Sequence, residues 1–277
     1  MAEAESEKCS VQPDTSKNLY IEGQESELER SLRNDKDTRH ILLIGIPGSG
    51  KSTFGNSLLG RKDFVAGCST KSLTQKVFCG VGHRKGKEIV VFDTPGIEKD
   101  DENNKRALDI LSKCFWCLSP GFHVVALVIA LGRITKEHLT LLKELKRVFD
   151  NKCLKYLLVV FTRLDDLGDN SLERLIDEAE PVIKDLTKGG RYIGINNKAE
   201  GEVMENQLCD FFNKVESMYE KNDFECYTDS LFKESHELLK KKAKECGMSE
   251  ADARTNLTPP EEQKEEVKKR FLPCTIL

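Results

Sequence analysis

Apolar residues recur along the chain in two patterns between residues 40 and 220. Short apolar runs predict β-strands at 41–44, 75–81, 88–92, 122–131, 156–161 and 192–195. Apolar residues at helical spacing predict helices at 51–59, 136–149, 172–186 and 202–219. Strands that alternate with helices are typical of a mostly parallel sheet flanked by helices. The pattern therefore predicts an α/β fold, with residues 82–86 as the hairpin turn between the second and third strands.

The composition describes a soluble, strongly charged surface over an ordinary core. Hydrophobic residues make up 38% of the chain and charged residues 32%. The net charge of −4 predicts that nucleic acid is not a partner, because nucleic acid selects a basic face. The longest apolar run, 122–131, is far shorter than the ~20 residues of a membrane span. Ten scattered cysteines, without a recognisable signal peptide, predict reduced thiols in the cytoplasm.

The two ends of the chain differ from the middle. Residues 1–38 are acidic and poor in large apolar residues, which predicts a disordered arm. Lys and Glu dominate from residue 222 to residue 270, which predicts a charged helical extension. Its few large apolar residues are compatible with helices that fold back on the domain and also with a projecting arm.

A phosphate-binding loop follows the first predicted strand. Residues 45–52 read Gly-x-x-x-x-Gly-Lys-Ser and lead directly into a predicted helix, which is the context that a P-loop requires. Backbone N–H groups and the helix N-terminus attract phosphate, the lysine reaches the β- and γ-phosphates, and the serine ligates Mg²⁺. The predicted ligands are Gly45, Ile46, Pro47, Gly48, Ser49, Gly50, Lys51, Ser52 and Thr53.

Two further motifs end neighbouring strands. Asp93-Thr-Pro-Gly96 follows an apolar strand, so Asp93 is a predicted Mg²⁺ ligand and the Gly96 N–H a predicted γ-phosphate donor. Thr-Arg-Leu-Asp165 follows another strand, and its carboxylate can accept hydrogen bonds from guanine N1 and N2. Adenine lacks these donors, so Asp165 favours GTP over ATP. An alternative interpretation makes Asp165 the cap of the next helix. A switch threonine should also contribute to the magnesium site, and Thr70 and Thr74 are both available.

These elements resemble the GIMAP family, the AIG-type immunity-associated GTPases that are related to septins. The box Leu-Ser-Pro-Gly-x-His at 118–123, continued by Leu-Gly-Arg-x-Thr at 131–135, is the most specific resemblance. Residues 55–60 and 191–200 are also similar to that family. The resemblance implies a P-loop NTPase with an AIG-type G domain at 39–221. It implies GTP or GDP with Mg²⁺ as ligands, and a homodimer or oligomer formed through the G domain.

Matched residue by residue, the family's switch threonine falls on Thr74, which would bind nucleotide and Mg²⁺. Its guanine-side residues fall on Arg163, Leu164, Asp165 and Asn197. Leu164 departs from the lysine that is frequent in relatives. The glutamine that orients water in Ras-like enzymes is replaced by Ile97, which predicts slow hydrolysis by a monomer. The resemblance implies that Arg133 acts as an arginine finger across a dimer, while a salt bridge at a strand end is the alternative.

The last four residues, Cys274-Thr-Ile-Leu, match the prenylation pattern Cys-a-a-X, so residues 271–277 form a predicted lipidated tail. A single lipid chain predicts reversible attachment to the cytoplasmic face of a membrane. Cys114 and Cys117 have Cys-x-x-Cys spacing but no second pair, which favours buried thiols over a metal site. The predicted function is GTP-dependent dimerisation at a membrane surface with slow or dimer-activated hydrolysis. A GTP-loaded scaffold without hydrolysis is the alternative.

Overall fold

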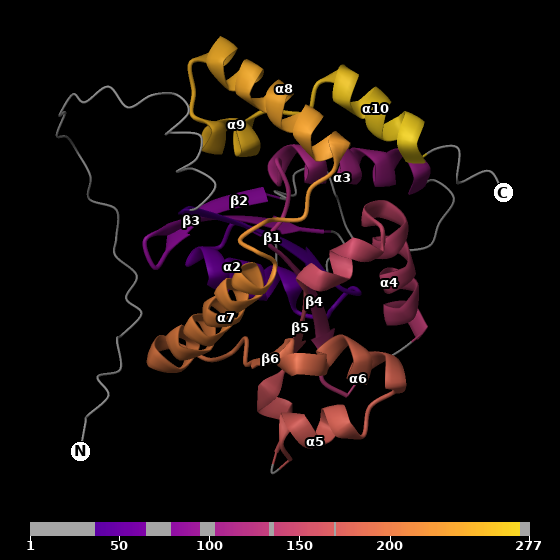
Figure 1. Cartoon of the computed structure of the whole chain (residues 1–277). Helices are drawn as coiled ribbons and strands as arrows, with labels where there is room; N and C mark the ends of the chain where they lie inside the picture. The colour runs from indigo at the N-terminus through magenta and orange to yellow at the C-terminus, as the bar shows by residue number, and fades with distance from the viewer. Residues whose placement is uncertain (1–36, 65–78, 95–102, 133–135, 169, 272–277) are drawn as a thin grey trace.

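The computed structural model describes residues 37–64, 79–94, 103–132, 136–168 and 170–271. A six-stranded sheet with the order β2-β3-β1-β4-β5-β6 forms its centre (Figure 1). β2 is antiparallel to β3, and every other neighbouring pair is parallel. The strands are β1 (Thr38–Ile44), β2 (Cys79–Arg84), β3 (Lys87–Asp93), β4 (Val124–Ala130), β5 (Leu157–Thr162) and β6 (Tyr192–Ile195). The predicted α/β class is confirmed.

Helices cover both faces of this sheet and continue beyond its last strand. The α-helices are α2 (Lys51–Leu59), α3 (Asn103–Cys117), α4 (Lys136–Phe149), α5 (Leu172–Asp177), α6 (Pro181–Thr187), α7 (Gly201–Lys221), α8 (Ser230–Cys246), α9 (Glu250–Asn256) and α10 (Glu261–Phe271). Short 3-10 helices are η1 (Asn151–Tyr156), η2 (Leu164–Asp166) and η3 (Lys188–Gly190).

Alternate residues of the central strands enter two separate cores. In β1, Ile41 and Leu43 pack with α2 and α7, whereas Leu42 and Ile44 pack on the opposite face. All seven residues of β4 are buried, because parallel strands at the centre of a sheet are covered on both faces. The continuous apolar run in the sequence therefore marks the middle of the sheet.

Two sequence predictions are corrected at their boundaries. Residues 82–84 belong to β2, so the hairpin turn is only Lys85-Gly86, with φ of 50° and 75° respectively. The single helix predicted for 172–186 is two helices, and Pro181 begins the second. Proline is favoured in the first turn of a helix and disfavoured inside one, which explains the break. Helices α2 and α4 begin and end where the sequence predicts.

The C-terminal extension folds back onto the domain. Helices α8, α9 and α10 lie over α3 on one side of the molecule (Figure 1). The indole Nε1 of Trp116 donates to the Ala253 carbonyl at 3.3 Å, and Gln263 Nε2 donates to the Ser112 carbonyl at 3.0 Å. Val267 of α10 is fully buried. Of the two arrangements compatible with the sequence, the folded-back one is correct.

Arg254 of α9 is the central polar contact of this layer. Its guanidinium donates to the carbonyl oxygens of Cys117 at 2.8 Å and Ser119 at 2.7 Å, and only 6% of the residue is exposed. Glu250 lies 3.5 Å away and offsets its charge. Arg254 thus ties the extension to the end of α3, where the chain turns toward β4.

The sequence box of residues 118–135 is divided between opposite ends of β4. Its first part, 118–123, precedes β4 and contacts the C-terminal extension. Phe122 and Tyr227 exchange backbone hydrogen bonds of 3.1 and 2.9 Å, and a Cβ at Gly121 would overlap the Tyr227 carbonyl oxygen. Leu131 and Gly132 follow β4 at the other edge of the sheet. The described residues of the two halves, 118–123 and 131–132, therefore lie at opposite ends of β4.

Within the described residues, no helix has the length and apolar character needed to cross a membrane.

Candidate functional site

The predicted phosphate loop lies at the carboxyl ends of the parallel strands, where open α/β sheets bind their ligands. Gly48 and Gly50 have φ of 75° and 88°, a conformation that favours glycine. A Cβ on Gly45 would stand 2.5 Å from the Val128 carbonyl oxygen, so this position also requires glycine. The three glycines let the backbone turn tightly between β1 and α2. The N-terminus of α2 carries no side-chain cap.

Side chains from distant loops support this turn. Thr162 Oγ1, at the end of β5, donates to the Ser49 carbonyl at 2.5 Å. Asn197 Nδ2 donates to the Gly50 carbonyl at 3.2 Å. Lys51 is buried, and its ammonium donates to the Ile46 carbonyl at 3.2 Å, within the loop itself. A phosphate would therefore meet the lysine and the backbone N–H groups of one preformed loop.

The predicted metal ligands also lie together. Ser52 Oγ donates to Asp93 Oδ2 at 2.6 Å, although the two residues are 41 positions apart. Thr94 fixes the end of β3 through hydrogen bonds from its N and Oγ1 to the Leu43 carbonyl, at 3.2 and 2.8 Å. A hydroxyl and a carboxylate are oxygen ligands of the type that Mg²⁺ prefers. The donor set therefore fits the metal that the sequence predicts.

The loop after β5 carries the predicted base-reading residues. Arg163 has φ of 59°, and residues 164–166 form the short helix η2. Leu164 packs against β6, since a Cβ on Gly194 would stand 2.8 Å from its Cδ1. A packing role explains the apolar residue at this position. Ser171 caps the following helix by accepting from the Arg174 N–H, so the alternative of Asp165 as that cap is wrong.

Asp165 pairs with Lys198, a residue that no sequence motif marks. Lys198 Nζ lies 2.5 Å from Asp165 Oδ2. This hydrogen bond, more than any other interaction, holds the pKa of the Asp165 carboxyl below its usual value. The same partner raises the pKa of Lys198. The carboxylate is therefore ionised at neutral pH and ready to accept hydrogen bonds.

The loop after β6 completes the edge. Asn197 Oδ1 is buried and has no hydrogen-bond partner among the described residues. Ser49 Oγ is also buried and has no hydrogen-bond partner among these residues. Unsatisfied buried polar atoms are costly, so two of them beside a phosphate loop indicate a place for a polar ligand. Asn197 joins the loop after β6 to the phosphate loop.

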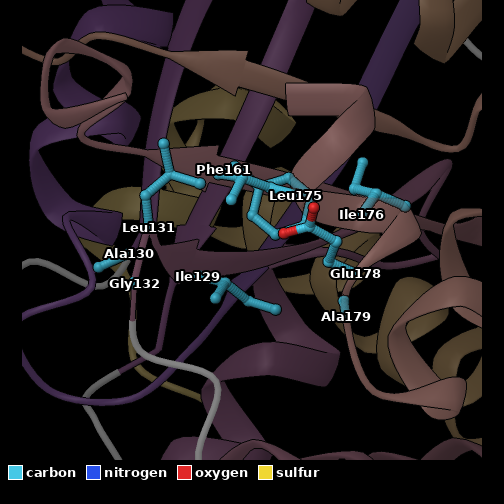
Figure 2. A pocket seen from close by; sticks show the side chains of 9 residues that line it. All are labelled: Ile129, Ala130, Leu131, Gly132, Phe161, Leu175, Ile176, Glu178 and Ala179. Carbon is cyan, nitrogen blue, oxygen red and sulfur yellow. The ribbon is translucent and has the colours of Figure 1, made fainter. Parts of the chain in front are cut away.

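A cavity of about 280 Å³ opens beside this edge, on the sheet face opposite α2. Figure 2 shows Ile129 and Phe161 at the ends of β4 and β5, with Leu175 and Ile176 of α5 near them. Leu131 and Gly132, from the second half of the box, complete one wall. The lining is apolar apart from Glu178, whose carboxylate pairs with Arg174 at 2.9 Å. Its walls contain none of the predicted phosphate or base ligands.

Several predicted residues lie outside the described part of the chain. They are Thr70, Thr74, Gly96, Ile97, Arg133 and Cys274, together with residues 1–36 of the predicted arm and 272–277 of the predicted tail. Cys114 and Cys117 are described and buried, and burial raises the pKa of both thiols. Within the described ranges, no three His, Cys, Asp or Glu side chains form a group suited to a metal ion.

Comparison with known proteins agrees with this geometry. Residues 39–246 match the AIG1 family. The chain is 33% identical over 181 residues to GTPase IMAP family member 8 of Rattus norvegicus, covering 63% of this chain but only 26% of that protein. It thus spans about a quarter of that relative's length. Immune-associated nucleotide-binding protein 5 of Arabidopsis thaliana is 31% identical over 248 residues, covering 84% of this chain and 77% of that protein.

Solved structures of similar fold include a dimerization-deficient mutant of Toc33 from Arabidopsis thaliana. It has a TM-score of 0.50 and 16% sequence identity, and covers 69% of this chain and 89% of that one. A second structure concerns the chloroplast translocon components atToc33 and psToc159, with a TM-score of 0.50 and 17% identity, covering 69% of this chain and 86% of that one. At these identities the likeness is one of fold.

Proposed function

Because the chain belongs to the AIG1 family, we propose that it binds GTP and GDP with Mg²⁺ at the edge formed by β1, β3, β5 and β6. One observation supports this most strongly. The phosphate loop and the base-reading loops form one hydrogen-bonded unit, joined by Thr162 to Ser49 and by Asn197 to Gly50. Lys51 would hold phosphate, Ser52 and Asp93 the metal, and Asp165 the guanine. Thr74 and Gly96 are proposed to complete the site.

We propose that two copies associate through this edge when GTP is bound. In atToc33 and psToc159, dimerization is important for the GTPase activity. Leu131 and Gly132 end at the same edge as the phosphate loop. We propose that Arg133, the next residue in the sequence, acts across the interface as an arginine finger. An arginine supplied across an interface stabilises the charge of phosphoryl transfer by ~10³–10⁵ in rate. The proposed activity is therefore slow in a monomer and faster in a dimer.

The test is the release of phosphate from GTP and from ATP, measured over a range of protein concentrations. Activity per molecule should rise with concentration for GTP, and Arg133→Ala should abolish the rise. Arg147→Ala is the matched control, because Arg147 is an exposed residue of α4 and pairs with Glu144 at 2.8 Å. Tight GTP binding without phosphate release would favour the alternative, a GTP-loaded scaffold. A preference for ATP would contradict both.

We also propose that the chain is a cytoplasmic protein attached to a membrane through prenylated Cys274. The tail follows α10, whose last turn contains Lys268, Lys269 and Arg270. Lys268 and Lys269 pair with glutamates of the same helix at 3.5 and 2.5 Å, so their attraction to anionic lipid is weakened. Attachment by one lipid chain and a neutralised basic cluster is reversible. Cys274→Ser should move a fluorescent fusion from membranes to the cytosol.

The domain division proposed for this function is a G domain at 39–221 and an extension at 222–270. The AIG1 match continues to residue 246, which includes α8. Helices α9 and α10 lie beyond it. Because both pack on α3, we treat the extension as part of the folded unit that binds nucleotide.

A further inference from the structure

Lys198 occupies a defined position in the loop after β6. Its backbone N–H donates to Asn196 Oδ1 at 2.9 Å, and the Asn196 N–H donates to Gln207 Oε1 at 2.7 Å. Since Gln207 belongs to α7, the turn that presents Lys198 is attached to a long helix. The ammonium then reaches across to Asp165, 33 residues earlier in the chain, at 2.5 Å.

This ion pair contributes little to the stability of the fold. The Lys198 side chain is 78% exposed, and ion pairs in such surroundings are screened by water and salt. The ion pair matters because of its position at the proposed base site. Asp165 is the carboxylate proposed to accept hydrogen bonds from a purine, so any base that reaches it also meets the ammonium of Lys198.

The chemistry at purine C2 distinguishes the bases that such a pair can accept. Guanine presents an N1–H and a 2-amino group, and a carboxylate can accept from both. Xanthine presents an N1–H and a 2-oxo oxygen, which a lone carboxylate repels. A lysine ammonium has three N–H donors, so it can contact the carboxylate and the 2-oxo oxygen together. Hypoxanthine has only hydrogen at C2, so its binding does not depend on a contact between Lys198 and the C2 substituent.

We propose that Lys198 is a specificity-determining residue of the base site, and that through it the protein accepts xanthine nucleotides as well as guanine nucleotides. The inference rests on the proposed function, since it requires guanine-nucleotide binding at Asp165. It adds a residue and a ligand class to that site. Lys198 donates to the oxygen at C2, while Asp165 accepts from N1.

The test compares the dissociation constants of GDP, xanthosine diphosphate and inosine diphosphate by calorimetry. Lys198→Met keeps an unbranched side chain that is one heavy atom shorter and removes the charge. In this variant, the dissociation constant of xanthosine diphosphate divided by that of GDP should rise about tenfold. This is the effect of losing one charge-assisted hydrogen bond. Lys198→Arg should keep the ratio of the parent. The dissociation constants of GDP and inosine diphosphate should change in parallel and by less than about threefold.

Lys188→Met is the matched control. Lys188 is 75% exposed and pairs with Asp185 at 3.0 Å, but it lies before β6, at the other end of that strand. Its substitution should leave all three constants unchanged. An unchanged ratio in Lys198→Met would overturn this inference and leave the proposed function intact. A parent protein that binds no GDP would overturn both.

Discussion

At the scale of single residues, a hydrogen bond of 2.6 Å joins the hydroxyl of Ser52 to the carboxylate of Asp93. We predict that Ser52→Ala weakens GDP binding about tenfold in Mg²⁺ and has little effect in EDTA, because it removes one of the proposed ligands of the ion. Ser57→Ala is the control, since Ser57 Oγ of the same helix donates to the Thr53 carbonyl of its own helix. An equal loss with and without Mg²⁺ would contradict the metal role.

Two buried histidines predict how stability changes with pH. His123 Nδ1 accepts from the His40 N–H at 2.9 Å, and His40 Nδ1 contacts the Gly121 carbonyl at 2.7 Å. Burial lowers the pKa of His40 and lowers that of His123 to about 3. Both are neutral in the folded protein, whereas the unfolded chain takes up protons below its ordinary histidine pKa of about 6.5.

The unfolded state therefore binds more protons as the pH falls from about 6.5 toward 3, and stability decreases in that window. We predict that the free energy of unfolding drops by about 1 kcal/mol per histidine and per pH unit below pH 6. Urea denaturation between pH 7.5 and 5 measures this, at pH values where the carboxylates are still ionised. A flat profile over that range would contradict it.

At the scale of elements, the contact of α9 with the end of α3 depends on Arg254. Arg254→Met leaves the Cys117 and Ser119 carbonyls without this donor in a buried site. We predict that it lowers the free energy of unfolding by about 3 kcal/mol. Arg174→Met, at an exposed pair with Glu178, should change it by less than about 1 kcal/mol. Similar effects of the two substitutions in urea denaturation would contradict the predicted importance of Arg254.

The sequence predicts the helices and strands whose apolar residues recur at regular spacing within the element itself. Helix α4 was predicted to the residue because its apolar positions recur at helical spacing. The interruption before Pro181 was missed because apolar spacing continues across it, although the proline itself was a signal. The length of β2 was missed because its glycines and charged residues resemble a turn.

The residues of the candidate site that belong to sequence motifs were predictable. Lys51, Ser52, Asp93 and Asp165 were selected from their positions after strands, and the structure brings them to one edge. Lys198 was not selected, because its contact with Asp165 crosses between loops and leaves no periodic pattern. Arg254 was missed for the same reason, since it bonds carbonyl oxygens 135 and 137 positions away.

At the scale of the whole molecule, the last three helices cover α3 and the first part of the box. We predict that a chain ending at Cys246 melts about 10 °C lower than the full chain. It loses Arg254, Gln263 and the buried Val267, and exposes Trp116 to water. Thermal denaturation measures the shift, and binding of a hydrophobic dye reports the exposed surface. An unchanged melting temperature would show that α9 and α10 are dispensable.

The covering of α3 by the last helices also has a consequence for synthesis on the ribosome. The contact between Trp116 and the Ala253 carbonyl joins residues 137 positions apart. Domains generally begin to fold from the N-terminal side while the chain is still growing. The sheet can thus assemble once β6 has emerged, but the apolar side of α3 stays uncovered until α10 follows. During that interval the growing chain exposes Phe115 and Trp116, which are fully buried in the folded protein. We expect chaperones that recognise apolar surface to bind it at this stage.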